Sequence, residues 1–532
     1  MGRKGDEMAD TANTAEVKYK ARGVLAGNNI QSKGTPAHEL FTEVAQTPAS
    51  LTSARAALAA GALKGHRGTV RDATTAYLQA SLKTHNLDGT AAPTQWVRLP
   101  KSWWPKAWFK EDGTPVFYDP VVRLKKALYG HPESEAIWDK HLGDRLKKEG
   151  WLPVQNQPGC WYHAATESTL VVYVDDLLMV AAREHEQALW AAIEKHIDFS
   201  EPALPIDRYL GAHYIMEKFN DKHGKECMSF SVEMSDFLAS ACKAYEADVL
   251  RIPGAANLKL QKADTPYQSE DTAGDSDEPA GILSKVCASH LMRLLYAARV
   301  ARPDIQTAIV RLAKHITKWK VRHDRCLQRL FSYVHGSLAL RLTGSMPIGQ
   351  AAHARLVCWP DADLAGDKDS AKATGGFWVE LECGDHRWPL AWQSKRQTST
   401  TISTAESETI SLQRCLHKEG LPLQEALSNM LGVDLPLLAQ EDNSQCIAAV
   451  TNGYSANMRQ LSRVQRTCIS AMHELFYPEV EEDFLSGELD AQPELNCSII
   501  YCPSGAHKGD MFTKPLERPP FIAGLTKIGM ML

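Results

Sequence analysis

The sequence predicts a protein of several domains with α/β and α+β architecture, and three observations support this. At about 150 residues per domain, a chain of 532 residues suggests three or four domains. Residues 170–180 (LVVYVDDLLMV) are apolar and β-branched around two central aspartates, which is typical of two buried strands joined by a tight turn. After about residue 350, strand-like and helical segments alternate as in a compact α/β domain.

The composition is that of a globular protein, with 44% hydrophobic and 23% charged residues. The sequence contains no run of about 18 apolar residues and begins with a polar segment, so we expect no membrane span and no secretory signal. Its twelve cysteines form no CxxC pair and no zinc-binding spacing with histidine. We therefore expect reduced thiols in a cytosolic or nuclear protein.

The net charge of −5 argues against a nucleic-acid partner when it is taken over the whole chain. Basic residues nevertheless cluster at 123–126, 311–329 and 459–466, and such clusters create local positive surfaces that the total conceals. Each run is also compatible with an ordinary solvated helix face.

The elements follow one another in a recognisable order. We expect a disordered lead over 1–16, short helices and strands over 17–205, and an acidic exposed loop or linker at 264–282. Apolar residues at helical spacing predict helices over most of 283–340. Beyond 350 we predict strands at 355–359, 377–381 and 390–392, a helix from about Ala405, a strand before Asp442 and another at 497–501. This α/β unit covers 350–518 and leaves 519–532 as a tail.

Two adjacent aspartates, Asp175 and Asp176, need an explanation inside an apolar run. Burying one unpaired carboxylate costs several kcal/mol, and two adjacent carboxylates also repel each other. A divalent cation such as Mg²⁺ would neutralise them, whereas the alternative is a plain polar turn, which aspartate also favours. Upstream, Asp72 begins another transition from strand to helix, and three acids from two strands can hold two metal ions.

Four further acids are spread through the second half of the chain. They are Asp361, Glu406 or Glu408, Asp442 and Asp510, each beside an apolar strand or on a helix. Such a set can form a second two-metal site that activates water for phosphodiester hydrolysis. From spacing alone, chance is the better explanation, because the chain contains 64 Asp and Glu.

The residues around these acids resemble a known family. In the first half the segments are KYKARGVLAG (18–27), DATTAYLQA (72–80), WVRLP (96–100), LKKALYG (124–130), YVDDLL (173–178) and RYLG (208–211). In the second half they are WPDADLAGD (359–367), LAWQSKRQ (390–397), STAESETISL (403–412), EDNSQCI (441–447) and GDMFTKPL (509–516). In this order they resemble the reverse transcriptase and ribonuclease H region of copia-type LTR retrotransposon polyproteins.

The resemblance implies a right-hand polymerase followed by a ribonuclease H-like α/β domain. Fingers and palm would cover 17–205, thumb and connection 206–345, and the nuclease 350–518. It also implies metal-binding catalytic residues, with two Mg²⁺ or Mn²⁺ ions per active site: Asp72, Asp175 and Asp176 for polymerisation, and Asp361, Glu408, Asp442 and Asp510 for hydrolysis. Glu408 is preferred to Glu406 because it fits the helical E-x-x-A pattern better.

Other family positions concern the incoming nucleotide. Lys20 and Arg22 match basic residues that reach the triphosphate, and Tyr77 matches the aromatic residue that excludes a ribose 2′-hydroxyl; a solvated strand and a core aromatic are the respective alternatives. Glu133 replaces a glutamine that shapes the nucleotide pocket, and Glu135 stands in place of the family's usual proline. These two carboxylates would repel a triphosphate unless they face away.

The implied function is RNA-directed DNA polymerase with ribonuclease H activity. Its partners would be an RNA template, a DNA primer, RNA–DNA hybrids and deoxynucleoside triphosphates, in a retroelement particle of the cytoplasm or nucleus. Basic helices at 311–329 would contact duplex phosphates. His507 would either assist product release or be a solvent-exposed histidine. The alternative is a catalytically inactive relic or domesticated nucleic-acid-binding protein, and the chain would be the C-terminal part of a polyprotein or a truncated copy.

Overall fold

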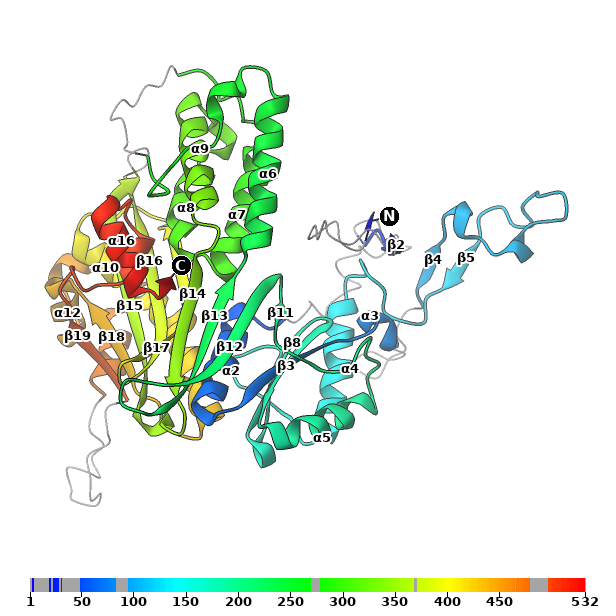
Figure 1. Cartoon of the computed structure of the whole chain (residues 1–532), viewed down its shortest axis with the longest axis horizontal. Helices are drawn as coiled ribbons and strands as arrows, with labels where there is room; N and C mark the ends of the chain where they lie inside the picture. The colour runs from blue at the N-terminus through cyan, green and yellow to red at the C-terminus, as the bar shows by residue number, and fades with distance from the viewer. Residues whose placement is uncertain are drawn as a thin grey trace.

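A computed structural model of the chain contains several β-sheets with helices packed against them, so a mixed α/β protein of several domains is confirmed (Figure 1). The structure describes residues 2–3, 19–20, 23–27, 30, 48–82, 94–268, 278–367, 371–464, 466–478 and 496–531.

The first large sheet has six strands in the order β10-β3-β9-β8-β7-β6. Its neighbouring strands are antiparallel. The strands are β3 (Arg67–Asp72), β6 (Leu152–Pro153), β7 (Cys160–His163), β8 (Ser168–Tyr173), β9 (Asp176–Ala181) and β10 (Leu204–Pro205). The predicted hairpin at 170–180 is β8 and β9, which lie in the middle of the sheet.

Both faces of the central strands are covered, which explains why residues 170–172 of β8 and 177–181 of β9 are apolar without alternation. Leu170, Leu177 and Met179 pack on one face with helices α4 (Ser134–Lys148) and α5 (Arg183–Glu194). Val171 and Leu178 point to the opposite face and join the core around helix α2 (Leu51–Lys64). Successive side chains of a strand alternate between faces, so a strand covered on both sides loses the usual polar alternation.

The second sheet has the order β11-β12-β13-β14-β20 and is also antiparallel. Its strands are β11 (Arg208–Tyr209), β12 (Ala212–Asn220), β13 (Glu226–Glu233), β14 (Arg341–Pro347) and β20 (Met530–Met531). Between β13 and β14 the chain forms α6 (Ser235–Arg251), α7 (Cys287–Val300), α8 (Gln306–Ala313) and α9 (Val321–Gly336), which stand together at one end of the molecule (Figure 1).

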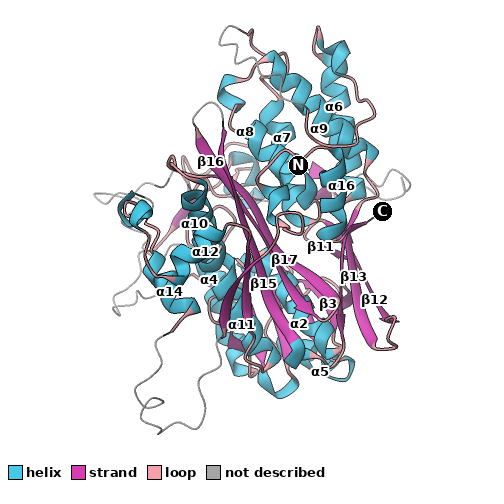
Figure 2. Ribbon diagram, turned by 90° about the vertical axis from the view of Figure 1, so that its left-hand side faces the viewer, coloured by secondary structure: helices cyan, strands magenta, loops and turns pink. Residues whose placement is uncertain are grey.

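The third sheet has the order β17-β16-β15-β18-β19, with β15, β18 and β19 parallel. Its strands are β15 (Ala354–Asp367), β16 (Lys372–Cys383), β17 (His386–Arg396), β18 (Leu437–Glu441) and β19 (Cys497–Tyr501). Helices α10 (Thr404–Cys415) and α12 (Ser444–Thr451) lie beside it (Figure 2). The other α-helices described in this half are α11 (Leu421–Leu431), α13 (Leu461–Val464), α14 (Ile469–Phe476) and α16 (Arg518–Lys527).

Helix α2 holds the three sheets together. Its alanine-rich sequence favours helix, the Ser50 hydroxyl accepts the Ser53 N–H at 2.9 Å, and Gly65 ends the helix at a φ of 72°. The helix contacts β8, β13, β14 and β17, so all three large sheets pack against it. The buried Arg55 donates to the carbonyls of Leu390, Arg299 and Val300 at 3.1, 2.5 and 3.0 Å.

A small two-stranded ribbon projects from the six-stranded region beyond helix α3 (Ala76–Gln79) (Figure 1). It consists of β4 (Trp96–Arg98) and β5 (Val121–Arg123). Large apolar side chains are exposed on it, among them Trp96 at 59% and Val121 at 48%.

The C-terminal segment differs from the predicted tail. Residues 519–532 include most of α16 and the short strand β20, and β20 pairs with β14 rather than ending free. The register joins Met530 to Leu342 and Met531 to Arg341. Two paired residues are too short to be recognised from sequence, because their partner strand lies almost 190 residues upstream and supplies the pairing.

Two predictions lie mainly outside the described residues. Of the lead over 1–16, only Gly2–Arg3 is described, as β1, which pairs with β2 (Tyr19–Lys20). The central part of the acidic segment 264–282 also lies outside. Its described ends contact the basic helices: the Arg329 guanidinium donates to the Thr265 carbonyl at 2.9 Å, and the Lys320 ammonium donates to the Glu278 carbonyl at 2.7 Å. Some of the basic side chains at 311–329, which we expect to contact duplex phosphates, therefore contact the acidic segment instead.

Within the described ranges, every helix is too short or too polar to cross a membrane.

Candidate active sites

The β8–β9 hairpin is closed by a two-residue turn, Val174-Asp175, with Tyr173 paired to Asp176. Val174 has a φ of 57°, a left-handed conformation that a β-branched residue seldom adopts. The indole N–H of Trp138 donates to the Val174 carbonyl at 2.7 Å and holds the turn from helix α4. Backbone strain of this kind is concentrated at functional sites, where surrounding contacts maintain it.

Asp72 lies beside this turn at the end of β3. It is the cross-strand partner of Asp176, and the Ala73 N–H donates to the Asp175 carbonyl at 2.7 Å. Asp72 is exposed, and Asp175 and Asp176 are half-buried. Burial, then Asp175, then Asp72 raise the pKa of Asp176 to about 6. The three acids thus border one open end of the sheet, although their oxygens do not all lie within 4.8 Å of one another.

Tyr77 lies on α3 next to these acids. Its ring is 5.0 Å from that of Tyr129, at an angle of 62°. Burial, then the charges of Glu135 and Asp175, together raise the pKa of the half-buried phenol to about 12. Tyr77 therefore borders the open end of the sheet, and Glu135 lies near it.

The other nucleotide-contacting candidates are described less fully. Glu133 is half-buried and immediately precedes α4, where its backbone N–H donates to the His131 ring at 3.1 Å. For Lys20 only the backbone in β2 is described, and Arg22 lies outside the described residues.

The acids of the second half form a compact group. Asp361 lies in β15, Glu408 in α10 and Asp442 directly after β18, and one oxygen of each lies within 4.8 Å of the others. Asp361 and Glu408 are only 0% and 2% exposed. Residues 361, 408 and 442 meet here because α10 packs across β15 while β18 runs parallel beside it.

Asp510 reaches this group through a lysine. The Lys514 ammonium lies 2.5 Å from an Asp510 oxygen and 3.5 Å from an Asp361 oxygen. The Thr513 hydroxyl donates to the other Asp361 oxygen. The Lys514 charge therefore compensates part of the carboxylate charge, and both acids raise the lysine pKa despite its burial.

A fifth acid, Glu441, was not among the predicted residues. It ends β18 and is 0% exposed, and one of its oxygens accepts the Asn443 N–H at 3.1 Å. Among the described residues, the second oxygen of Glu441 and one oxygen of Glu408 are buried without a hydrogen-bond partner. Burial raises the pKa of both carboxyls well above the ordinary value, and the charge of Asp361 adds to the effect at Glu408.

This donor set fits a hard divalent cation. Oxygen ligands suit Mg²⁺ and Mn²⁺, and the two unpartnered carboxylate oxygens are groups that a cation would satisfy. Glu406 points elsewhere, because it accepts the Ile402 N–H at 2.7 Å near the start of α10. Of the two glutamates, only Glu408 lies in the acidic group.

His507 is buried in the structure. It is 2% exposed, its Nε2 lies 2.9 Å from the Gln440 carbonyl, and its Nδ1 accepts the Gly509 N–H at 3.1 Å. The expectation of a solvent-exposed histidine was wrong, because this side chain fixes the loop before Asp510 against the end of β18. The neighbouring Ser504 hydroxyl donates to Asp442 at 2.7 Å.

The comparisons with known proteins agree with the motifs. The chain is 25% identical over 403 residues to the retrovirus-related Pol polyprotein from transposon TNT 1-94 of Nicotiana tabacum, which covers 74% of this chain and 27% of that protein. It is 24% identical over 521 residues to the retrovirus-related Pol polyprotein from transposon RE1 of Arabidopsis thaliana, 96% of this chain and 30% of that protein. A transposon Ty5-1 protein of Saccharomyces cerevisiae is 21% identical over 286 residues, 52% of this chain and 82% of that protein.

The predicted resemblance is therefore confirmed: the relatives are Pol polyproteins of copia-type transposons, at modest identity over much of the chain. The chain spans between a quarter and a third of the length of the two plant polyproteins. No protein-family model matches it.

Proposed function

We propose that the chain is an RNA-directed DNA polymerase with ribonuclease H activity on RNA–DNA hybrids, with two Mg²⁺ or Mn²⁺ ions at each active site. The principal observation is the convergence of Asp361, Glu408 and Asp442, whose ligand atoms lie within 4.8 Å of one another. Similarity to Pol polyproteins and the Asp72–Asp176 pairing at the hairpin extend the proposal to the polymerase.

At the polymerase site, Asp72, Asp175 and Asp176 would hold the metal ions. Bound there, the ions would lower the pKa of the primer 3′-hydroxyl and neutralise the leaving pyrophosphate. Tyr77, beside Asp175, would exclude a ribose 2′-hydroxyl, and Lys20 with Arg22 would contact the triphosphate. Replacing Tyr77 by valine should raise ribonucleotide use relative to deoxynucleotide use by at least about tenfold, since the excluding ring is lost, while Tyr77→Phe keeps the selection.

At the nuclease site, Asp361, Glu408, Asp442 and Asp510 would hold the ions that activate water against the RNA phosphodiester. Lys514 would move from its ion pairs with Asp361 and Asp510 when cations enter, because both carboxylates then acquire a stronger partner. The partners would be RNA template, DNA primer and hybrid duplex, in a retroelement particle of the cytoplasm or nucleus.

Two assays separate the activities. Primer extension on poly(rA) with an oligo(dT) primer should require Mg²⁺ or Mn²⁺ and be lost in Asp175→Asn. Hybrid cleavage should be lost in Asp442→Asn, which keeps primer extension. If the wild type incorporates no nucleotide with either metal, the polymerase proposal fails; if cleavage persists in Asp442→Asn, the nuclease assignment fails.

A second candidate function is a nucleic-acid-binding protein that has lost polymerase activity. Glu135 favours it, because this carboxylate raises the pKa of Tyr77 and therefore lies near the proposed nucleotide pocket. Burial and Asp139 raise the pKa of Glu135 itself. Salt-dependent duplex binding without incorporation by the wild type would support this candidate over the polymerase.

A further inference from the structure

A second group of metal-ligand side chains lies far from both acidic sites. Asp221, Cys227 and His386 each have a ligand atom within 4.8 Å of the other two. Asp221 follows β12, Cys227 lies in β13 and His386 begins β17. The group therefore joins the tip of the β12–β13 hairpin to the turn between β16 and β17.

The nitrogen-to-oxygen separation inside this group is longer than an ordinary hydrogen bond, and the separations to oxygen and to sulfur both fit a tetrahedral metal centre. His386 Nε2 lies 3.6 Å from Cys227 Sγ and 3.4 Å from Asp221 Oδ2. An N–H···O hydrogen bond normally spans about 2.7–3.2 Å. Around a tetrahedral Zn²⁺ with ordinary bond lengths, the nitrogen would stand about 3.5 Å from sulfur and about 3.3 Å from oxygen.

Neighbouring groups already orient two of the ligands. Asp221 Oδ1 accepts the N–H groups of His223 and Lys225, both at 2.8 Å, which leaves Oδ2 directed at His386. His386 Nδ1 lies 2.8 Å from the Ser345 hydroxyl. When Nδ1 donates to this hydroxyl, Nε2 presents its lone pair toward Asp221 and Cys227. Metal-binding histidines characteristically have such a partner on the other ring nitrogen.

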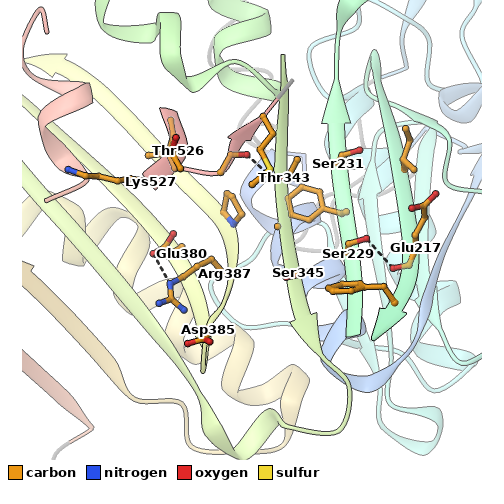
Figure 3. A pocket seen from close by; sticks show the side chains of 18 residues that line it. Glu217, Ser229, Ser231, Thr343, Ser345, Glu380, Asp385, Arg387, Thr526 and Lys527 are labelled. Atoms are coloured by element: carbon orange, nitrogen blue, oxygen red, sulfur yellow. Dashed lines mark hydrogen bonds and ion pairs between the residues drawn. The ribbon is translucent and has the colours of Figure 1, made fainter. Parts of the chain in front are cut away.

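The surroundings are sheltered but open on one side. Cys227 is buried, and the Asp221 and His386 side chains are 8% and 14% exposed. A cavity of about 400 Å³ adjoins the group, and Ser345, Asp385 and Arg387 contribute to its wall (Figure 3). The cavity is lined by the sequence neighbours of His386 rather than by the three ligands themselves. The two hairpin tips are also joined by Lys222 and Asp385, at 2.6 Å.

We propose that Asp221, Cys227 and His386 bind one Zn²⁺, with water as the fourth ligand, and that this ion cross-links the second sheet to the third. Thiolate and carboxylate together offer two negative charges for the cation, and the neutral imidazole completes the set. Binding transfers the Cys227 thiol proton to the buffer. The site is separate from the proposed catalytic ions in ligands, metal and role.

Cobalt(II) absorption tests the site on the full chain. Stripped protein titrated with Co²⁺ should develop a thiolate-to-cobalt charge-transfer band that saturates at one equivalent and disappears when Zn²⁺ is added. Sites made only of carboxylates give no such band, so the catalytic acids do not interfere. Absence of the band in the wild type at stoichiometric Co²⁺ overturns the proposal.

Variants assign the ligands. Cys227→Ser should abolish the band, and Ser345→Ala should weaken Co²⁺ binding about ten- to a hundredfold. Cys468→Ser, which removes an exposed thiol, and Cys383→Ser, which changes a buried thiol on the neighbouring strand, should leave the band unchanged. A band that survives in Cys227→Ser overturns the assignment. Zn²⁺ should also raise the Tm of the wild type but not of Cys227→Ser, and circular dichroism checks that the variant is folded.

Discussion

The two groups of acids differ most in their exposure to water. Asp72 is exposed and Asp175 and Asp176 are half-buried at the open end of a sheet, whereas Asp361, Glu408 and Glu441 are almost completely buried. Exposed carboxylates are solvated and can stand apart until a cation and a substrate gather them. Buried carboxylates have no such solvent, so they require protonation or a counter-ion within the protein.

The buried group therefore contains its own partial substitute for a cation. Lys514 pairs with Asp361 and Asp510, and Thr513 donates to Asp361. At the hairpin, neither Asp175 nor Asp176 forms an ion pair with a lysine or arginine in the described part of the chain, and the Ser200 hydroxyl lies 3.3 Å from an Asp72 oxygen. Metal binding should consequently change stability at the proposed nuclease site far more than at the proposed polymerase site, and the following predictions test this difference.

The largest effect on stability is expected at Arg55, on the helix α2 that packs between the sheets carrying the two groups of acids. Arg55→Ala leaves three carbonyl groups without their donor and removes a guanidinium that lies 3.9 Å from the Trp392 ring. The free energy of unfolding should fall by about 3 kcal/mol or more, and both activities should decline together. Urea denaturation and both assays measure this. Arg67→Ala, which breaks an exposed pair with Glu186, should change the free energy of unfolding by less than about 1 kcal/mol.

The second-largest effect on stability is expected when Lys514, the internal counter-ion, is removed. Lys514→Met should lower metal-free stability by about 1–3 kcal/mol, a value reduced because the lysine side chain is 37% exposed. Mg²⁺ should restore much of this loss by taking over the charge of Asp361 and Asp510. Thermal denaturation in EDTA and in Mg²⁺ compares the two states. Equal loss under both conditions would contradict the role of Lys514, and Lys218→Met is the exposed control.

Neutralising a buried acid should have the opposite sign. Glu441→Gln should stabilise the metal-free protein by about 1–2 kcal/mol, because a neutral amide replaces a carboxylate with one unpartnered oxygen. The contact with the Asn443 N–H can persist through the amide oxygen. Asp175→Asn at the hairpin should change stability by no more than about 0.5 kcal/mol. Equal responses in an EDTA denaturation series would remove the distinction between the two groups.

The smallest effect concerns the nucleotide pocket. Glu135→Gln should raise kcat/KM for the deoxynucleotide about two- to fivefold, because it removes negative charge near Tyr77 and the triphosphate. Steady-state primer extension at low ionic strength measures the gain, which salt should diminish. Asp144→Asn, an exposed change farther along α4, is the matched control. An unchanged value in Glu135→Gln would mean that this carboxylate faces away from the nucleotide.

The local sequence pattern was sufficient to predict most of the strands and helices near the acids. The predicted strand at 497–501 has the bounds of β19, and the strand predicted before Asp442 is β18. The helix expected from about Ala405 begins at Thr404, where the Ser403 hydroxyl accepts the Glu406 N–H at 3.2 Å. Such segments are predictable because apolar periodicity and capping residues act over a few positions.

Other parts of the structure could not be predicted from the local sequence pattern. Glu441 was overlooked because a glutamate at a strand end resembles any surface acid until its burial is known. Cys227 and His386 are separated by 159 positions, so no spacing rule could join them. The C-terminal strand β20 has no strand signal of its own, because its partner β14 lies far upstream.

The sequence by itself determined the local features. These are the YVDD hairpin, the upstream Asp72, the capped helix of Glu408 and the order of the family motifs. Hydrophobic pattern, turn chemistry and motif similarity are all properties of short segments. Only the tertiary structure decided which acids share a site, how deeply they are buried and which lysine faces them. These properties depend on strand register and helix packing between distant segments. Because of their burial, Asp361, Glu408 and Glu441 need protonation or a counter-ion, whereas Asp72 is exposed to water.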